Sequence, residues 1–276
     1  MGVEFPTERT PTPSEAIMFG RVLATLYGAL CYVIFFATFL YAIAFVGNIG
    51  FGNMHVPRSI DVGPSASLVE ALLIDAVLLS IFAVQHSVMA RSWFKRAWTR
   101  IVPQVVERST YVLFSSLALI LLFWQWRPIT TTVWSVQSEI GAKLLWVAFA
   151  AGWAMVLIST FLISHFELFG LKQVWSNFTG KTIEPMKFRT PLFYKAVRHP
   201  LYLGFVIAFW ATPHMTGGHA FFAFMCTAYM LVAIQFEERD LVHAFGDTYT
   251  NYRRNVSMIL PLPKKAASAE AKGAAK

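Results

Sequence analysis

Long apolar stretches with few charges dominate this sequence of 276 residues. Charged residues make up only 14% of the chain, against about a quarter in soluble domains. Runs of about 20 apolar residues are long enough to cross the hydrocarbon core of a bilayer as helices. The sequence therefore predicts an all-α, polytopic integral membrane protein. Its candidate spans are 21–46, 68–90, 109–126, 140–164, 201–212 and 219–236.

The fifth run is too short for an ordinary span. Twelve residues make a helix of only about 18 Å, whereas the hydrocarbon core is about 30 Å thick. A segment with Pro213, Gly217 and Gly218 follows and reads as a turn. We therefore expect five or six spans, with the last two runs forming a helical hairpin that returns the chain to the same side. A single transmembrane domain over 21–263 would lie between an N-terminal segment, 1–20, and a disordered tail, 264–276.

Basic residues predict the orientation of these spans. Segments 91–108, 165–200 and 237–276 hold five, six and seven Lys or Arg, and the loops on the opposite side hold three. By the positive-inside rule, both termini face the cytoplasm. The net charge of +8 is therefore explained by lipid orientation, and no nucleic-acid partner is expected. Cys31 and Cys226 lie in apolar runs without CxxC spacing, which argues against a disulfide or a thiolate metal site.

Costly polar residues gather at the cytoplasmic ends of five runs. Ionisable groups at membrane depth are expensive and usually functional. Their convergence predicts a site that is open to cytosolic solutes. The residues are Gln85, His86, Glu107, Arg108, Ser109, Ser164, His165, Glu167, Arg198, His199, Gln235, Glu237 and Glu238.

The segment 198–202 has a local mechanism for binding an anion. Pro200 at the first helical position loses no hydrogen bond, and His199 falls at the N-cap. The amides of that first turn favour a carboxylate or a ribose oxygen, and Arg198 can grip a carboxylate. Tyr202 could contact a base, and Gly204 allows close approach. A basic residue at a proline-capped helix start is also common, so this segment alone does not establish a site.

Glu237 and Glu238 follow the last apolar run. Neighbouring residues on a helix point about 100° apart, so the two cannot act as one carboxylate dyad. One acid can face a ligand while the other holds a cation. Acids at a helix C-terminus oppose the dipole, which favours a functional reason for the pair.

These two segments resemble a known pattern. The last 80 residues are similar to the membrane isoprenylcysteine carboxyl methyltransferases and phospholipid methyltransferases, with Arg-His-Pro-Leu-Tyr at 198–202 and Glu-Glu-Arg-Asp-Leu at 237–241. The resemblance implies S-adenosylmethionine binding within 195–256 and no soluble Rossmann-type domain. Over 20–263 the chain also resembles the bacterial methanethiol S-methyltransferases, at 84–91, 107–111, 123–128 and 165–171. That family implies methylation of methanethiol to dimethyl sulfide at the bacterial inner membrane.

The resemblance also implies residue roles. Glu237 or Glu238 would take the cofactor's amine or ribose hydroxyls, Arg198 or the amides after Pro200 its carboxylate, and Tyr202 its adenine. A general base would be His165, His86 or Glu167. A lone membrane histidine is, however, more often a structural hydrogen-bond partner. The mouth of the site would be formed by Gln85, Gln173, Trp175 and Arg253, and no metal is expected.

Two alternatives remain open. The substrate could be another small thiol, an isoprenylcysteine or a lipid. The Gln-His-Ser at 85–87 is also similar to NnrU-type membrane proteins, which would make the chain a non-enzymatic haem- or solute-binding protein. A transporter is disfavoured because the polar groups lie at one surface and not at the midplane. The sequence does not fix the oligomeric state.

Overall fold

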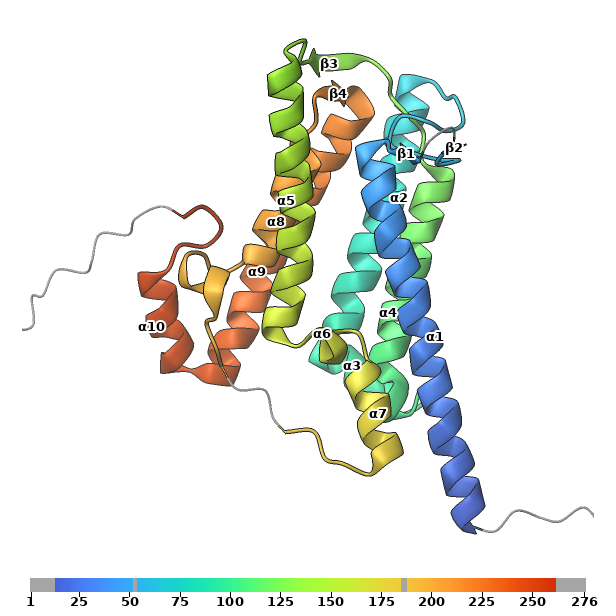
Figure 1. The fold of residues 1–276 in the computed structure, drawn as a ribbon. Helices are drawn as coiled ribbons and strands as arrows, with labels where there is room; N and C mark the ends of the chain where they lie inside the picture. Colours follow the sequence, from blue (N-terminus) through green and yellow to red (C-terminus); the bar gives the residue numbers. More distant parts are fainter. Residues whose placement is uncertain (1–12, 52–53, 185–187, 262–276) are drawn as a thin grey trace, which may run out of the picture.

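The computed structural model describes residues 13–51, 54–184 and 188–261, and these are mostly helical (Figure 1). Among these described residues, five helices are long and apolar enough to cross a membrane, which confirms the predicted all-α, multi-pass architecture. The predicted tail, 264–276, lies outside the described residues, as does most of the predicted segment 1–20. The long helices are α1 (Pro13–Gly47), α2 (Leu68–Ala90), α4 (Gln104–Gln125), α5 (Glu139–Ile163) and α9 (Gly217–Phe245).

Short elements mark the two ends of the bundle (Figure 1). One end, here called the strand end, carries β1 (Gly50–Phe51), β2 (Met54–His55), β3 (Thr132–Ser135) and β4 (His214–Thr216). The other, here called the polar end, carries α3 (Ser92–Trp98), α6 (His165–Leu168), α7 (Leu171–Thr179), η1 (Leu192–Lys195) and α10 (Asp247–Asn255). The described start of α1 also lies at the polar end.

The short helix α8 (Pro200–Trp210) begins the expected hairpin. Eleven residues span only about 16.5 Å as helix, and an extended segment completes the crossing. That segment ends in β4, which pairs antiparallel with β3 in the loop between α4 and α5, with Met215 opposite Trp134. The chain therefore reaches the strand end after α8 and returns through α9.

Helix α9 does not end at Phe236, where the apolar run stops. It continues to Phe245, so Glu237 and Glu238 lie within a continuous helix. The expectation that these acids oppose the dipole at a helix end was therefore wrong. The physical reason is that hydropathy marks the edge of an apolar layer, whereas a helix can continue into polar surroundings.

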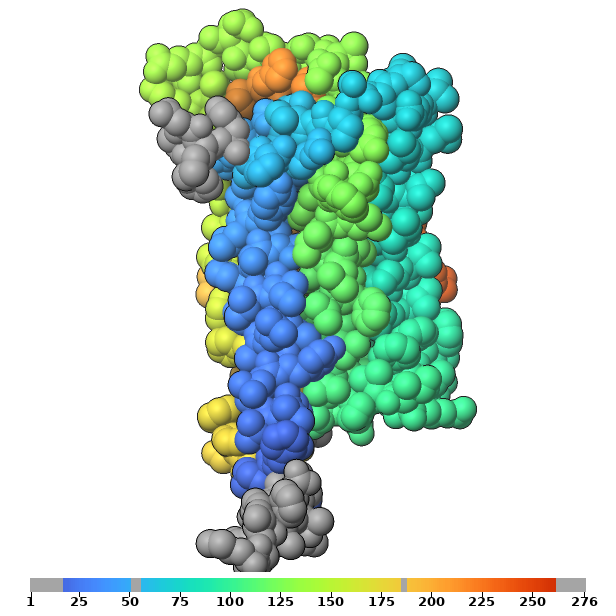
Figure 2. All heavy atoms as spheres, turned by 90° about the vertical axis from the view of Figure 1, so that its right-hand side faces the viewer, coloured from blue at the N-terminus to red at the C-terminus, as the bar shows by residue number. Residues whose placement is uncertain are grey.

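The helices pack in two groups, one formed by α1, α2 and α4 and the other by α5, α8 and α9. Within the second group α5 and α8 cross closely at Gly152 and Gly204. A Cβ added to either glycine would lie 2.7 Å from the carbonyl oxygen of the other. The helix α7 packs across α1 and α4, and Figure 2 shows α1 lying along one face beside α4 and α2.

An aromatic-rich core joins the two groups towards the strand end. Phe45 and Leu122 come from the first group, and Trp153 and Phe209 from the second. The outer faces of the long helices expose large apolar side chains, among them Leu26, Val77, Leu144 and Val232. Such faces are stable against lipid tails, so the hydrophobic effect of water does not drive these helices together.

Candidate active site

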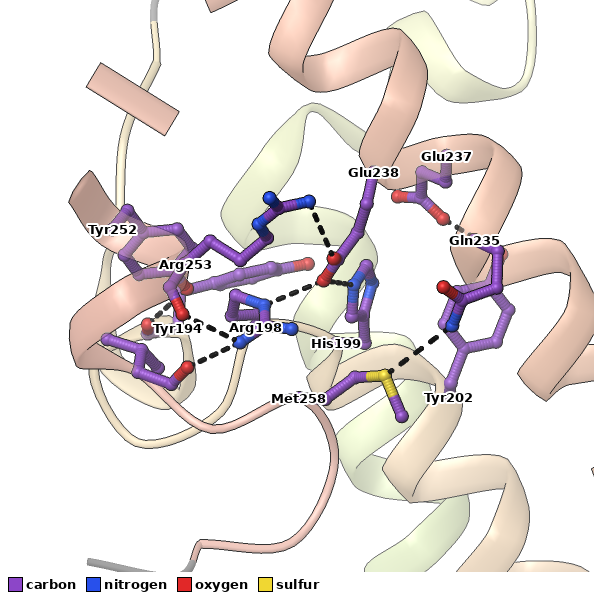
Figure 3. A network of polar contacts seen from close by, with 11 residues as sticks. Tyr194, Arg198, His199, Tyr202, Gln235, Glu237, Glu238, Tyr252, Arg253 and Met258 are labelled. Atoms are coloured by element: carbon purple, nitrogen blue, oxygen red, sulfur yellow. Dashed lines mark hydrogen bonds and ion pairs between the residues drawn. The ribbon is translucent and has the colours of Figure 1, made fainter. Parts of the chain in front are cut away.

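A buried ion pair fixes the start of α8 against α9 (Figure 3). Nε of Arg198 donates to Oε1 of Glu238 at 2.7 Å, and less than a tenth of each side chain is exposed. Nε2 of His199 lies 3.1 Å from the same oxygen. Nη1 of Arg253 lies 3.9 Å from Oε2. Glu238 is therefore the member of the acidic pair that holds a cation of the protein.

Arg198 also binds the segment that follows α10. Its Nη1 donates to the carbonyl oxygens of Arg253, at 3.1 Å, and Val256, at 2.5 Å. The backbone amide of Arg198 donates to the carbonyl of Ser257 at 2.8 Å. We call Arg198, Glu238 and these carbonyl groups the arginine clamp. Because Pro200 at the first helical position starts α8 just after the clamp, the helix start has a fixed position.

Glu237 faces a different partner. The hydroxyl of Tyr202 donates to its Oε2 at 2.9 Å, and Figure 3 shows Glu237 and Glu238 pointing apart. Glu237 is half-buried. Within the described residues its second oxygen, Oε1, has no hydrogen-bond partner. Of the two acids, Glu237 is therefore the one with capacity for a ligand.

His86 lies in a cluster made by α2 and α4. The hydroxyl of Tyr111 is 3.0 Å from Nδ1 and 3.0 Å from Nε2 of its ring. The hydroxyl of Ser115 is 3.2 Å from Nδ1. Phe82 stacks on the imidazole with ring centroids 5.2 Å apart. The guanidinium of Arg108 lies over the Tyr111 ring, 4.8 Å from its centroid.

Three tyrosines connect this cluster to the helix that carries the acidic pair. Tyr229 of α9 shares a 3.0 Å hydrogen bond with Ser87 of α2. Tyr202 of α8 lies close enough to both Tyr229 and Tyr111 to interact with them electrostatically. The structure thus brings His86, Tyr202 and Glu237 to one polar layer between α2, α4, α8 and α9. Sequence reasoning did not assign roles to Tyr111 and Tyr229. A tyrosine within an apolar span was the available signal, because its hydroxyl needs a partner when buried.

His165 is held elsewhere, at the junction of α1, α5 and α6. Its Nε2 is 2.9 Å from the hydroxyl of Tyr32, and its Nδ1 is 2.8 Å from that of Thr160. Phe161 stacks on the ring at a centroid distance of 4.1 Å. The residue is 3% exposed, and burial lowers the pKa of its imidazole below the usual value. Both nitrogens are therefore engaged by hydroxyl groups of the protein.

Two cavities open at the polar end. The first, of about 510 Å³, is lined by Glu107 and Arg108 of α4 together with Glu167 and Gln173. The second, of about 570 Å³, is lined by residues that include Arg91, Trp93, Asp240 and His243. Lys95 of α3 lines both, so the cavities adjoin.

The remaining predicted residues differ in exposure and in whether their polar side-chain atoms have partners. Glu167 is paired with Lys172 at 2.7 Å. Oε1 of Gln173 is buried and unpartnered, and so is Oε1 of Gln85. Trp175 is 59% exposed and does not line either cavity. Across residues 13–51, 54–184 and 188–261, no group of three or more His, Cys, Asp or Glu is arranged to hold a metal ion.

Comparison with known proteins connects this geometry to a family. The methanethiol S-methyltransferase of Mycobacterium tuberculosis is 54% identical over 245 residues, which cover 89% of this chain and 98% of that protein. The chain belongs to the methanethiol S-methyltransferase family. The enzyme of the same name from Crocosphaera subtropica is 54% identical over 241 residues, 87% of this chain and 92% of that protein. This confirms the family predicted from the sequence.

A more distant relative lies outside this family. Nurim of Mus musculus is 29% identical over 184 residues, which cover 63% of this chain and 70% of that protein. No family model matches the chain, and no solved structure matches it. The assignment to the methanethiol S-methyltransferase family therefore rests on full-length similarity to individual proteins.

Proposed function

We propose that this chain transfers a methyl group from S-adenosylmethionine to methanethiol, forming dimethyl sulfide, in a bacterial inner membrane. The observation that carries this proposal is the 54% identity, over nearly their whole length, to proteins named methanethiol S-methyltransferase. In this proposal the polar end faces the cytoplasm because it carries the described parts of the basic segments, and both termini are assigned to the same side. The two cavities then open towards the cytosolic cofactor.

The side chains around α8 and α9 fit the cofactor. Its amine or ribose hydroxyls need an anionic acceptor, which Glu237 provides through its unpartnered Oε1. Its carboxylate is suited to the first turn of α8 after Pro200, where helix amides and the dipole favour an anion. Tyr202 forms the wall beside it, whereas Gly204 packs against Gly152 of α5. When bound, S-adenosylmethionine supplies an electrophilic methyl group on a sulfonium cation.

Glu238, Arg198 and His199 have a supporting role in this proposal. Arg198 and Glu238 form an ion pair, His199 lies 3.1 Å from the same carboxylate oxygen, and Arg198 also donates to a carbonyl group of the C-terminal segment. They therefore hold α8 at a fixed distance from Glu237. Preorganised groups of this kind keep the reacting atoms aligned, which accounts for a large part of many rate enhancements.

His86 is the proposed general base. The useful nucleophile is a thiolate, so a basic side chain within hydrogen-bond reach must receive the thiol proton, and a neutral imidazole nitrogen can accept one. His86 lies in the polar layer with Tyr202 and Glu237, whereas His165 is held at the junction of α1, α5 and α6 by Tyr32 and Thr160. Of the residues predicted for the base or the mouth, Glu167 and Gln173 line the first cavity, and this cavity is the proposed mouth of the site.

An assay of the purified protein in detergent tests this proposal. Methanethiol and S-adenosylmethionine should give dimethyl sulfide in the headspace, measured by gas chromatography, with one S-adenosylhomocysteine per sulfide. The matched variant is His86→Asn, which should bind S-adenosylmethionine normally but turn over more slowly by about 10²-fold or more. Activity on an isoprenylcysteine or a lipid without activity on methanethiol would overturn the substrate assignment. A haem absorption band without any methylation would favour the binding-protein alternative.

A further inference from the structure

The second cavity of the polar end lies where the apolar surface of two long helices stops. The end of α2, the start of α3 and the last turns of α9 form its walls. Arg91 and Lys95 contribute positive charge to its lining, Asp240 contributes a carboxylate, and His243 an imidazole. The proposed methyl transfer uses none of these four side chains. The role of this cavity of about 570 Å³ is therefore set by its own charges and surroundings.

The positive charge of this cavity is only partly balanced. Nη1 of Arg91 lies 3.2 Å from Oδ2 of Asp240, but the Asp240 side chain is largely exposed, and exposed ion pairs neutralise each other weakly. Across the described residues, Lys95 has no ion-pair partner. Burial lowers the pKa of Lys95 below its ordinary value, and the like charges of Arg108 and Arg91 lower it further, against the opposing effect of Glu107. An anion beside Lys95 would offset these costs.

Exposed apolar side chains continue from this cavity along both long helices. Phe236, the last residue of the final apolar run, is exposed on α9. The guanidinium groups of Arg91 and Arg239 lie 5.4 and 5.8 Å from the centroid of its ring. One turn earlier, Val232 is exposed on the same face of α9. On α2, Val84 is exposed two turns before Arg91. Cations therefore gather at the point where two lipid-facing surfaces end.

We propose that Arg91 and Lys95 bind the phosphate of an anionic phospholipid, whose acyl chains lie along the exposed apolar faces of α2 and α9. Basic pockets between transmembrane helices are typical sites for such headgroups. His243 can donate a ring N–H to the same phosphate. The exposed Trp93 of the lining fits a membrane interface, where tryptophan is enriched. A free phosphate ion would neutralise the same cations but would make no use of the apolar faces. The bound lipid connects α3 to α9 and stabilises this end of the fold.

Titration of the purified full chain in detergent with phosphatidylglycerol tests this site. The lipid should raise the melting temperature of the wild type until the site is full, whereas phosphatidylcholine, whose headgroup has no net charge, should have little effect. Lys95→Gln should weaken the apparent affinity for phosphatidylglycerol by about fivefold, the factor that one basic residue near anionic lipid contributes. Arg96→Gln is the matched control, because it removes one charge from the same short helix, but Arg96 is exposed and lines neither cavity. That variant and Lys95→Arg, which keeps the charge, should bind like the wild type.

Four results would overturn the lipid site. The first is a wild-type melting temperature that phosphatidylglycerol does not change, and the second is an equal increase with phosphatidylcholine. The third is an equal loss of affinity in Lys95→Gln and Arg96→Gln, because surface charge alone would then explain the attraction. The fourth is the same stabilisation by inorganic phosphate, which would assign the cavity to a soluble anion. If Lys95→Gln does not fold, Arg91→Gln takes its place with the same expected loss of about fivefold. These measurements need no turnover, so a failure of the proposed methyl transfer would leave them unaffected.

Discussion

Replacing Glu238 by Ala should affect folding far more than replacing its neighbour Glu237. In Glu238→Ala, Arg198 keeps its charge in a position where 7% of its side chain is exposed. Removing one partner of a buried ion pair costs about 3–5 kcal/mol. For a chain of this size, 1 kcal/mol shifts the melting temperature by about 2–4 °C. The expected decrease is therefore about 6–20 °C.

Glu237→Ala removes one hydrogen bond to the hydroxyl of half-buried Tyr202. Such a bond contributes about 0.5–1.5 kcal/mol, so the melting temperature should fall by only about 1–6 °C. Ligand binding shows the opposite order. S-adenosylmethionine should raise the melting temperature of Glu238→Ala by nearly as much as it raises that of the wild-type protein. It should hardly change the melting temperature of Glu237→Ala.

The assay is thermal unfolding of each purified variant in detergent, with and without S-adenosylmethionine. Glu238→Gln is the matched control. Its amide oxygen can still accept from Arg198, so its decrease should lie between those of the two alanine variants. A wild-type melting temperature for Glu238→Ala would refute the reasoning that the arginine clamp is a buried, stabilising pair. A full ligand-induced shift in Glu237→Ala would refute its place in the cofactor site.

Three further predictions follow from local geometry. Gly170 has φ +87°, and an added Cβ would lie 2.5 Å from Oγ of Ser109. Gly170→Ala should therefore lower the free energy of unfolding by more than the roughly 1–2 kcal/mol expected from left-handed backbone strain alone, which thermal unfolding would measure. Gly204→Ala should separate α5 from α8, seen as loss of both stability and methylation, because its Cβ would meet the carbonyl oxygen of Gly152 at 2.7 Å. The pKa of His165 is lowered by burial, so the unfolded chain binds more protons between the folded value and about 6.5. Stability should fall as pH drops through that window, and His165→Asn should remove this dependence of the melting temperature.

The spans and the polar end of this protein could be predicted because both depend on local sequence. Apolar runs report membrane depth directly, and the Lys and Arg counts separate the two ends of the bundle. The hairpin of α8 and α9 followed from the short length of the fifth run and from the Pro and Gly residues after it. The true end of α9 did not, because a helix can extend beyond the apolar layer that hydropathy detects.

The different roles of neighbouring or similar residues in the site depend on partners that are distant in sequence. Glu237 and Glu238 are neighbours, yet only the fold shows that one binds Tyr202 and the other Arg198, 40 residues away. His165 and His86 looked equivalent as candidate bases. Tyr32, 133 residues from His165, helps to engage its ring, whereas Tyr111 of α4 lies beside the ring of His86.

The arginine clamp makes the segment after α9 part of the site. The guanidinium of Arg198 is satisfied by carbonyl oxygens of residues 253 and 256, which follow the end of α9 at Phe245. A chain that ended with α9 would contain all the described long helices but lack two acceptors of Arg198 at the start of α8. A chain truncated just before residue 253 should insert like the full protein but remain inactive, because its arginine clamp cannot form.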